Sequence, residues 1–312
     1  MKKLAFFAGN SNPELAKEMA EHLKIKLGKI ELKKFADGET YANYLESVRG
    51  KEVYLLQSTC DPVNDNLMEL LIMIDAAKRA AAEKITCIIP YFGYAKQDRK
   101  ANDREPITAK LVAKLLDAAG ADAVIIMDLH SDQVQGFFDI NADFLYASGS
   151  LVKHFLKKGL KNLVVVSPDV GSSRRARAFA KRLGASLAIV DKRRPRPNVS
   201  EVMHLIGEVE GKIAIIVDDE INTAGTICNA ADAVMERGAK EVYAMASHAV
   251  FAGSAIERLK ASKFKEIIVT NSIPQKEKIS KVKVVSVASL LAEAIKCCNE
   301  NKSLSKLLNP VK

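Results

Sequence analysis

Residues Ile213 to Thr226 read IAIIVDDEINTAGT, and this stretch indicates the fold more directly than any other part of the chain. It begins with five apolar residues in a row, which is typical of a buried strand in a parallel sheet covered on both faces. Two adjacent carboxylates, Asp218 and Asp219, follow the apolar run, and a helical pattern begins at Ile227. The stretch therefore predicts a strand that ends at Val217, a short loop and a helix.

The loop before this helix has the composition of an anion-binding site. The first turn of a helix carries backbone N–H groups without internal partners, and the helix dipole adds positive charge there. Gly225 lets the backbone approach a ligand closely, and the hydroxyls of Thr223 and Thr226 can donate to phosphate oxygens. The carboxylate pair can accept hydrogen bonds from vicinal hydroxyls or hold a hydrated Mg²⁺. A phosphate beside a diol describes a ribose 5-phosphate group. The alternative is an ordinary strand–helix turn in which Asp and Thr residues cap the helix.

Strand-like apolar runs alternate with helical patterns along the whole chain, which predicts parallel sheets wound with helices. The predicted strands are Leu4–Ala8, Val53–Gln57, Ile85–Pro90, Ala123–Met127, Leu163–Ser167, Ser186–Val190, Ile213–Val217, Glu241–Ser247 and Glu266–Thr270. The predicted helices are Pro13–Leu23, Asn66–Ala81, Ile107–Ala119, Ser150–Lys157, Ser172–Leu183, Thr223–Arg237, Gly253–Leu259 and Ser289–Asn301. The series divides into two comparable halves near Tyr146–Gly149.

Polar groups recur where the predicted strands end. These groups are Asp128–His130, Ser167–Asp169, Asp191–Lys192 and Asp218–Asp219. Because ligands of open α/β sheets bind at the carboxyl ends of strands, this recurrence predicts one composite site.

Bulk properties narrow the class of protein. The chain has 312 residues, enough for two domains, with 48% apolar residues and a formal charge of +9. Aromatic residues are only 6% and do not alternate with basic ones, so a nucleic-acid partner is not expected. Five cysteines without metal-type spacing fit a reducing cytosol. Apolar runs stay below the roughly 18 residues that a bilayer crossing needs, so we expect a cytoplasmic protein without a membrane partner.

Five further segments establish a resemblance along essentially the whole chain. They are Phe35–Glu39 (FADGE), Tyr91–Lys100 (YFGYAKQDRK), Asp128–His130 (DLH), Ser167–Asp169 (SPD) and Asp191–Pro197 (DKRRPRP). With the loop at 218–226, which resembles the phosphoribosyl diphosphate motif of the type I phosphoribosyltransferase fold, the chain resembles the class I ribose-phosphate pyrophosphokinases. The resemblance implies an α/β fold with two phosphoribosyltransferase-like domains, 1–147 and 148–312. Each would be a mainly parallel sheet flanked by helices, with the extreme C-terminus packing back on the N-terminal domain.

The resemblance also implies a reaction. The β,γ-diphosphoryl group of MgATP passes to the C1 hydroxyl of ribose 5-phosphate and gives 5-phosphoribosyl 1-diphosphate and AMP, for nucleotide biosynthesis. It implies about two Mg²⁺ ions per active site. It further implies a homo-oligomer, a hexamer in this family, with ADP and inorganic phosphate as effectors.

Site residues follow from the same resemblance, position by position. The catalytic residues are Lys192 and Arg194, in a flexible loop, with Arg193 and Arg196 as helpers. The ATP-binding residues are Asp37, Gly38, Glu39, Lys96 and Gln97. The ribose 5-phosphate residues are Arg194, Asp218, Asp219, Asn222, Thr223, Ala224, Gly225 and Thr226. The metal contacts are His130 and Asp169, and the effector residues are Ser47, Arg49 and Arg104.

Three residues depart from the family pattern. Lys96 stands where Arg is more usual, Asn222 where Asp is usual, and Glu220 where an apolar residue is usual. They leave open a non-catalytic regulatory subunit with a decayed site. Two further alternatives are a phosphoribosyltransferase that consumes phosphoribosyl diphosphate, which would not need the flexible loop or a second half, and a nucleic-acid binder, which rests on net charge alone.

Overall fold

The structure, a computed structural model, describes residues 4–193 and 202–308. The chain divides into two compact units, and neither unit is a single continuous segment. Unit 1 comprises Met1–Tyr146, Ser272–Pro274 and Ser286–Asn309, and unit 2 comprises Ala147–Asn271, Gln275–Val285 and Pro310–Lys312.

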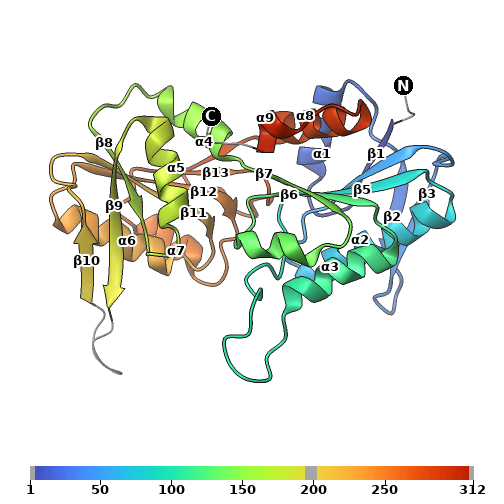
Figure 1. Ribbon diagram of the computed structural model, residues 1–312, viewed down its shortest axis with the longest axis horizontal. Helices are drawn as coiled ribbons and strands as arrows, with labels where there is room; N and C mark the ends of the chain where they lie inside the picture. Colours follow the sequence, from blue (N-terminus) through green and yellow to red (C-terminus); the bar gives the residue numbers. More distant parts are fainter. Residues whose placement is uncertain (1–3, 194–201, 309–312) are drawn as a thin grey trace. The chain divides into compact units, whose positions relative to one another are not determined.

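Unit 1 is built on a five-stranded parallel sheet in the order β1-β4-β5-β6-β7 (Figure 1). Its strands are β1 (Leu4–Ala8), β4 (Glu52–Leu56), β5 (Lys84–Ile89), β6 (Ala123–Met127) and β7 (Asn141–Leu145). Its helices are α1 (Pro13–Leu23), α2 (Val63–Arg79), α3 (Thr108–Ala119), α8 (Ala288–Asn299) and α9 (Ser305–Leu308), with a 3₁₀ helix η1 (Asp132–Phe137). A separate antiparallel hairpin consists of β2 (Ile30–Lys34) and β3 (Thr40–Tyr44).

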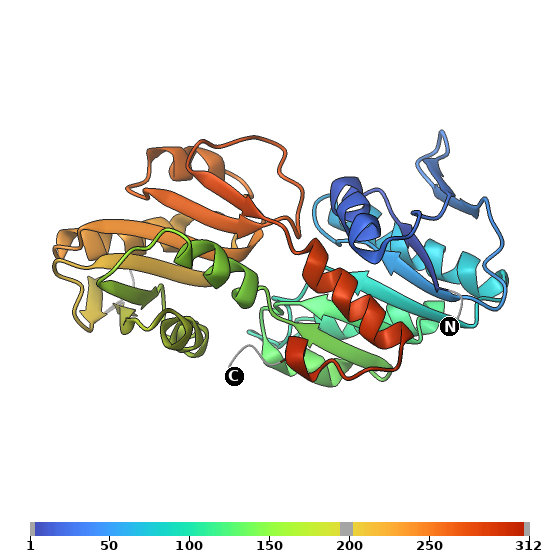
Figure 2. The same ribbon diagram turned by 90° about the horizontal axis from the view of Figure 1, so that it is seen from above.

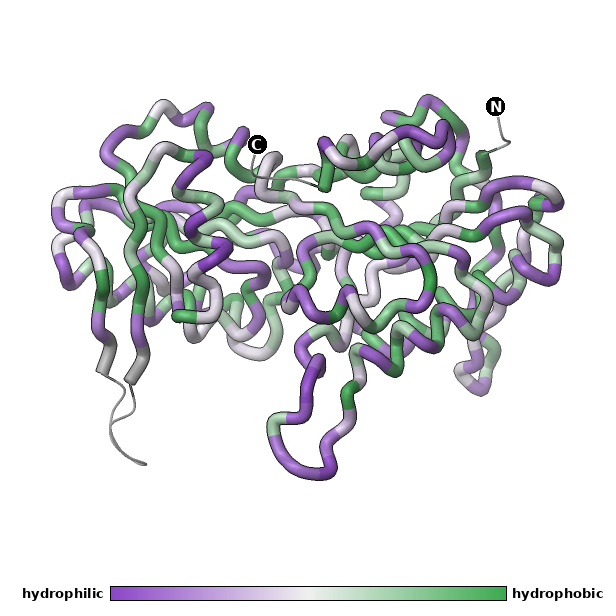
Figure 3. The backbone as a smooth tube through the Cα atoms, in the orientation of Figure 1, coloured by the Kyte–Doolittle hydropathy of each residue, from purple (hydrophilic) through white to green (hydrophobic). Residues whose placement is uncertain are grey.

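Strand alternation explains the two layers of helices in unit 1. Val53, Leu55 and Cys87 share one face of the sheet and belong to the core that α2 and α3 cover. On the other side of the unit, α8 packs against α1, although the two helices are far apart in sequence (Figure 2). Apolar residues run along the strands, whereas α2 and α3 alternate between polar and apolar residues (Figure 3).

Unit 2 is built on a seven-stranded sheet in the order β10-β9-β8-β11-β12-β13-β14, parallel except for the β9–β10 pair. Its strands are β8 (Leu163–Ser167), β9 (Ser186–Arg193), β10 (Val202–Ile206), β11 (Ile213–Ile221), β12 (Glu241–Ala249), β13 (Glu266–Thr270) and β14 (Val282–Val285). Its helices are α4 (Ser148–Leu156), α5 (Ser173–Leu183), α6 (Gly225–Glu236) and α7 (Ala255–Ala261). The expectation of mainly parallel sheets flanked by helices is thus confirmed.

Every predicted strand and helix is present, but five strands of the described residues were missed. They are β2, β3, β7, β10 and β14. Three of them lie at sheet edges and the other two form the isolated hairpin, so each pairs on one side only and needs no continuous apolar run. None of the helices within 4–193 and 202–308 has the length and apolar character that a bilayer crossing requires.

Candidate functional site

The carboxylate pair of unit 2 lies inside a strand, so the prediction that this strand ends at Val217 is wrong. Strand β11 continues to Ile221, because β12 is equally long and supplies backbone partners as far as Ala249. Asp218 and Asp219 therefore have fixed backbone positions in the sheet. The side chain of Asp218 is 18% exposed and that of Asp219 is 5% exposed.

A single arginine, Arg175, forms ion pairs with both carboxylates. Arg175, in α5, places Nη1 2.6 Å from Asp219 Oδ1 and 3.7 Å from Asp218 Oδ1. Asp218 Oδ1 also accepts hydrogen bonds from Ser172 Oγ at 3.1 Å and from the Asp219 N–H at 2.9 Å. Burial, and then the charge of Asp219, raise the pKa of Asp218 well above its usual range, while Arg175 opposes the shift. The two acids and the arginine together carry a net negative charge when both acids are ionised.

Asp169 joins this group through Ser172. It follows β8, and its Oδ1 accepts a hydrogen bond from the Ser172 N–H at 2.8 Å. The Ser167 hydroxyl donates to the Asp169 carbonyl at 2.7 Å and fixes the turn. Since Ser172 also donates to Asp218, the structure brings the predicted metal contact and the carboxylate pair into one hydrogen-bonded cluster. We call Asp169, Ser172, Arg175, Asp218 and Asp219 the acidic cluster.

The loop after β11 ends in a left-handed residue. Ala224 has φ +61° and ψ 0° and is the residue before α6, so the predicted helix start at Thr223 is two residues early. Its side chain has no polar atom to cap the helix, so the alternative of an ordinary turn with a side-chain cap is wrong. The N–H groups of Gly225 and Thr226 belong to the first turn, and the side chains of Thr223 and Thr226 are exposed. Residues 222–226 therefore form a candidate anion cradle.

The predicted flexible loop begins on an extended strand. Strand β9 was expected to end at Val190, but it reaches Arg193 because β10 pairs with it antiparallel, with Lys192 opposite Met203. Arg194 and Arg196 lie outside the described residues.

The predicted ATP residues of unit 1 lie on exposed turns. Asp37, Gly38 and Glu39 form the tip of the β2–β3 hairpin, where the Phe35 N–H donates to the Glu39 carbonyl at 2.8 Å. Gly38 has φ +95°, a value that favours glycine. The Asp37 carboxylate accepts from the Glu39 N–H at 3.1 Å.

Lys96 and Gln97 lie in a second turn, closed by the Gln97 N–H donating to the Tyr94 carbonyl at 2.9 Å. Both side chains are exposed. The structure brings this turn beside the segment after His130, because Gln133 Nε2 donates to the Asp98 carboxylate.

His130 is exposed and follows β6, as expected. Within the described ranges, three or more His, Cys, Asp or Glu side chains do not converge in a way that could hold a metal ion. Asp169, the other predicted metal contact, has a carboxylate oriented by the Ser172 N–H.

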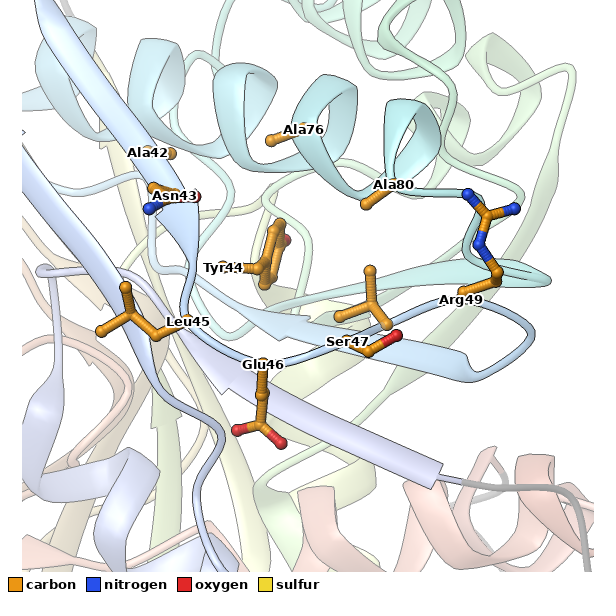
Figure 4. A pocket seen from close by; sticks show the side chains of 10 residues that line it. Ala42, Asn43, Tyr44, Leu45, Glu46, Ser47, Arg49, Ala76 and Ala80 are labelled. Carbon is orange, nitrogen blue, oxygen red and sulfur yellow. The ribbon is translucent and has the colours of Figure 1, made fainter.

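Two of the three predicted effector residues line one pocket. Ser47 and Arg49 lie on the rim of a cavity of about 530 Å³ between the segment after β3 and the end of α2 (Figure 4). Ala76 and Ala80 face it from the helix side. Arg104 does not line this cavity and lies in the exposed loop before α3, with φ +67°.

Sequence reasoning missed two arginines of this region, Arg175 and Arg258. Arg175 holds the carboxylate pair, and Arg258 Nη1 donates to the Thr223 carbonyl at 2.9 Å. Their partners are 44 and 35 residues away, so no short-range pattern could reveal them.

An α/β chain with two mainly parallel sheets, a cradle at a helix start and adjacent strand carboxylates defines a class of phosphate-binding proteins. Comparison with protein families narrows this class. Residues 4–120 match the N-terminal domain of ribose phosphate pyrophosphokinase, and residues 193–309 match the phosphoribosyl synthetase-associated domain. The chain belongs to the ribose-phosphate pyrophosphokinase family.

Individual relatives agree with this assignment. The chain is 58% identical over 307 residues to the ribose-phosphate pyrophosphokinase of Fusobacterium nucleatum, covering 97% of each. It is 55% identical over 310 residues to the Bacillus subtilis protein of the same name, covering 99% of this chain and 98% of the other. The crystal structure of the phosphoribosylpyrophosphate synthetase from Mycobacterium smegmatis matches with a TM-score of 0.91 and 42% identity, covering 96% of this chain and 100% of the other.

Proposed function

We propose that this chain is a ribose-phosphate diphosphokinase. It transfers the β,γ-diphosphoryl group of ATP to the C1 hydroxyl of ribose 5-phosphate and releases AMP and 5-phosphoribosyl 1-diphosphate, for nucleotide biosynthesis in the cytoplasm. The observation that carries the proposal is full-length identity of 55–58% to relatives of that name. The cradle at 222–226 beside the acidic cluster is the independent chemical support.

The proposed substrate residues of unit 2 differ in exposure, and their proposed roles differ accordingly. The first-turn N–H groups and the exposed hydroxyls of Thr223 and Thr226 suit the 5-phosphate. Asp218 is the more exposed carboxylate and accepts from the ribose hydroxyls, whereas Asp219, paired with Arg175, holds Asp218 in place through its N–H. Asn222 is half-buried and keeps hydrogen-bonding ability without charge.

Diphosphoryl transfer needs positive charge more than covalent chemistry. Lys192, in β9, and Arg194 stabilise the charge that develops on the transferred oxygens and on AMP. Asp37, Gly38, Glu39, Lys96 and Gln97 contact ATP. His130 and Asp169 hold Mg²⁺, which supplies positive charge next to the phosphate oxygens when bound.

We also propose a domain division, an oligomeric state and effectors for this chain. An N-terminal domain, 1–147, supplies the ATP-contacting segments and a C-terminal domain, 148–312, supplies the ribose 5-phosphate loop, with Ser286–Asn309 of the C-terminal half belonging to unit 1. The active form is a homo-oligomer, a hexamer, that responds to ADP and inorganic phosphate through Ser47, Arg49 and Arg104. The cavity beside Ser47 and Arg49 supports the first two of these residues.

A product assay tests the reaction. Purified protein with MgATP and ribose 5-phosphate should release AMP in step with 5-phosphoribosyl 1-diphosphate, without ADP. Lys192→Ala should lower kcat at least about a hundredfold, whereas Lys240→Ala, which removes an exposed lysine ahead of β12, should not change it. A well-folded wild-type protein that forms neither product would shift the assignment to the regulatory-subunit alternative.

A further inference from the structure

Arg258 reaches the candidate anion cradle from a neighbouring helix. It lies in α7, and its Nη1 donates a hydrogen bond to the Thr223 carbonyl at 2.9 Å. The same nitrogen would lie 3.3 Å from a Cβ atom added at Gly225, so the guanidinium lies against the loop on that side of Gly225. The Arg258 carbonyl in turn lies 3.9 Å from Cys228 Sγ in the first turn of α6, which holds the two helices together at this point.

The geometry of the peptide bond gives this contact a directional effect. In a trans peptide the C=O and the following N–H point in opposite directions within one plane. Holding the Thr223 carbonyl towards Arg258 therefore turns the Ala224 N–H away from Arg258, to the opposite side of the loop.

The backbone conformation of Ala224 needs stabilising contacts of this kind. Its φ of +61° lies in the left-handed region, which costs energy for a residue with a Cβ atom. The residue is 4% exposed, and its carbonyl accepts from the Cys228 N–H at 3.1 Å as the first link of α6. The peptide before Ala224 is thus fixed from one side by Arg258, and the peptide after it by the helix.

We propose that Arg258 is a positioning residue for ribose 5-phosphate: by holding the Thr223 carbonyl, it aims the Ala224 N–H at the 5-phosphate in the cradle. The inference rests on the proposed function of the loop. Arg258 acts through the backbone and does not itself contact the substrate. Arginine suits this task because its planar fork sets the direction of the donated hydrogen bond, whereas lysine gives one flexible donor group.

Three variants test the inference by steady-state kinetics. Arg258→Met keeps the length of the side chain and removes the donors, Arg258→Lys restores one charged donor group, and Lys260→Met removes one positive charge from the same helix as the control. We expect Arg258→Met to raise KM for ribose 5-phosphate about tenfold, equivalent to about 1.4 kcal/mol. KM for ATP should stay unchanged and kcat should stay within about twofold. Arg258→Lys should recover a large part of the loss, and Lys260→Met should resemble the wild type.

An unchanged KM for ribose 5-phosphate in Arg258→Met would overturn the inference, and so would an equal rise of KM in Lys260→Met. A fall of kcat without a change in either KM would assign Arg258 to another step and overturn it as well. Thermal unfolding of each variant shows whether the protein is folded, and Arg258→Lys provides the test if the methionine variant is not.

Hydrogen exchange separates this inference from the proposed function. Peptides that span residues 219–228 of the free protein should exchange faster in Arg258→Met than in the wild type or Lys260→Met. A wild-type protein without activity would refute the proposed function, while faster exchange in the variant would still support the hold of Arg258 on the loop. An active wild type with unchanged exchange and unchanged KM in the variant would refute the inference alone.

Discussion

Replacing Arg175 with methionine should destabilise unit 2 measurably. The change removes the positive charge 2.6 Å from Asp219 Oδ1, and the Asp219 side chain is only 5% exposed, so water cannot replace that charge. Removing one partner of a buried ion pair costs about 3–5 kcal/mol. Because Arg175 itself is 25% exposed, solvent screening lowers our expectation to about 2–3 kcal/mol. For a unit of this size, that loss corresponds to a fall in Tm of about 4–12 °C.

Circular dichroism during heating measures this fall. Arg177→Met is the matched control, because it removes an exposed arginine from the same helix and should change the unfolding free energy by less than about 0.5 kcal/mol. The double variant Arg175→Met/Asp219→Asn should recover most of the lost stability, since it leaves no unpaired charge at residue 219. Equal Tm values for the Arg175 and Arg177 variants would refute the reasoning, as would a double variant no more stable than Arg175→Met.

Three further predictions follow from single contacts. Burial, and then the charge of the neighbouring carboxylate, raise the pKa of Asp218 to about 8. Its protonated form therefore contributes to the free energy of unfolding. This contribution is fully present below the unfolded pKa and is lost as pH rises towards about 8. The Tm of Asp218→Asn minus the Tm of the wild type should therefore increase between about pH 5 and pH 8.5. A difference in Tm that stays constant over this range would contradict the raised pKa of Asp218. Gly93→Ala would place a Cβ atom 2.4 Å from the Thr59 carbonyl and should cost about 1–3 kcal/mol in urea unfolding, whereas Gly136→Ala, with nothing within 4 Å, should cost less than half of that. Asp37→Ala, on an exposed hairpin tip, should leave Tm unchanged and raise KM for ATP about tenfold, and a lower Tm with normal kinetics would show a structural role instead.

The sequence predicted the buried framework well because that framework depends on local patterns. Leu4–Ala8, Ala123–Met127 and Leu163–Ser167 were predicted with the observed bounds because each is an apolar run. Ala123–Met127 and Leu163–Ser167 also pair with a strand on both sides, whereas Leu4–Ala8 lies at the edge of its sheet. Helix Pro13–Leu23 was also predicted correctly, and Asn12 caps it by accepting from the Leu15 N–H at 3.3 Å.

The strand ends and site residues that were not predicted depend on contacts with residues distant in sequence. The end of β11 at Ile221 is set by the length of β12, and the extension of β9 to Arg193 is set by β10, so neither can be read from the strand itself. The candidate substrate residues were placed by resemblance and remain predictions. Arg175 carries no signal in its own neighbourhood, because only folding brings it to Asp219.

The return of α8 to unit 1 has a consequence for synthesis on the ribosome. Leu291, Ala292 and Ile295 are buried within unit 1, and Asn299 donates to the buried Glu52 carboxylate at 2.9 Å. Almost all of unit 2 is translated before these residues emerge. The first-made unit must therefore wait, with α1 lacking its partner helix, until the second unit has been synthesised. Nascent chains stopped after residue 146 should consequently bind chaperones, and release should come only once α8 has left the exit tunnel.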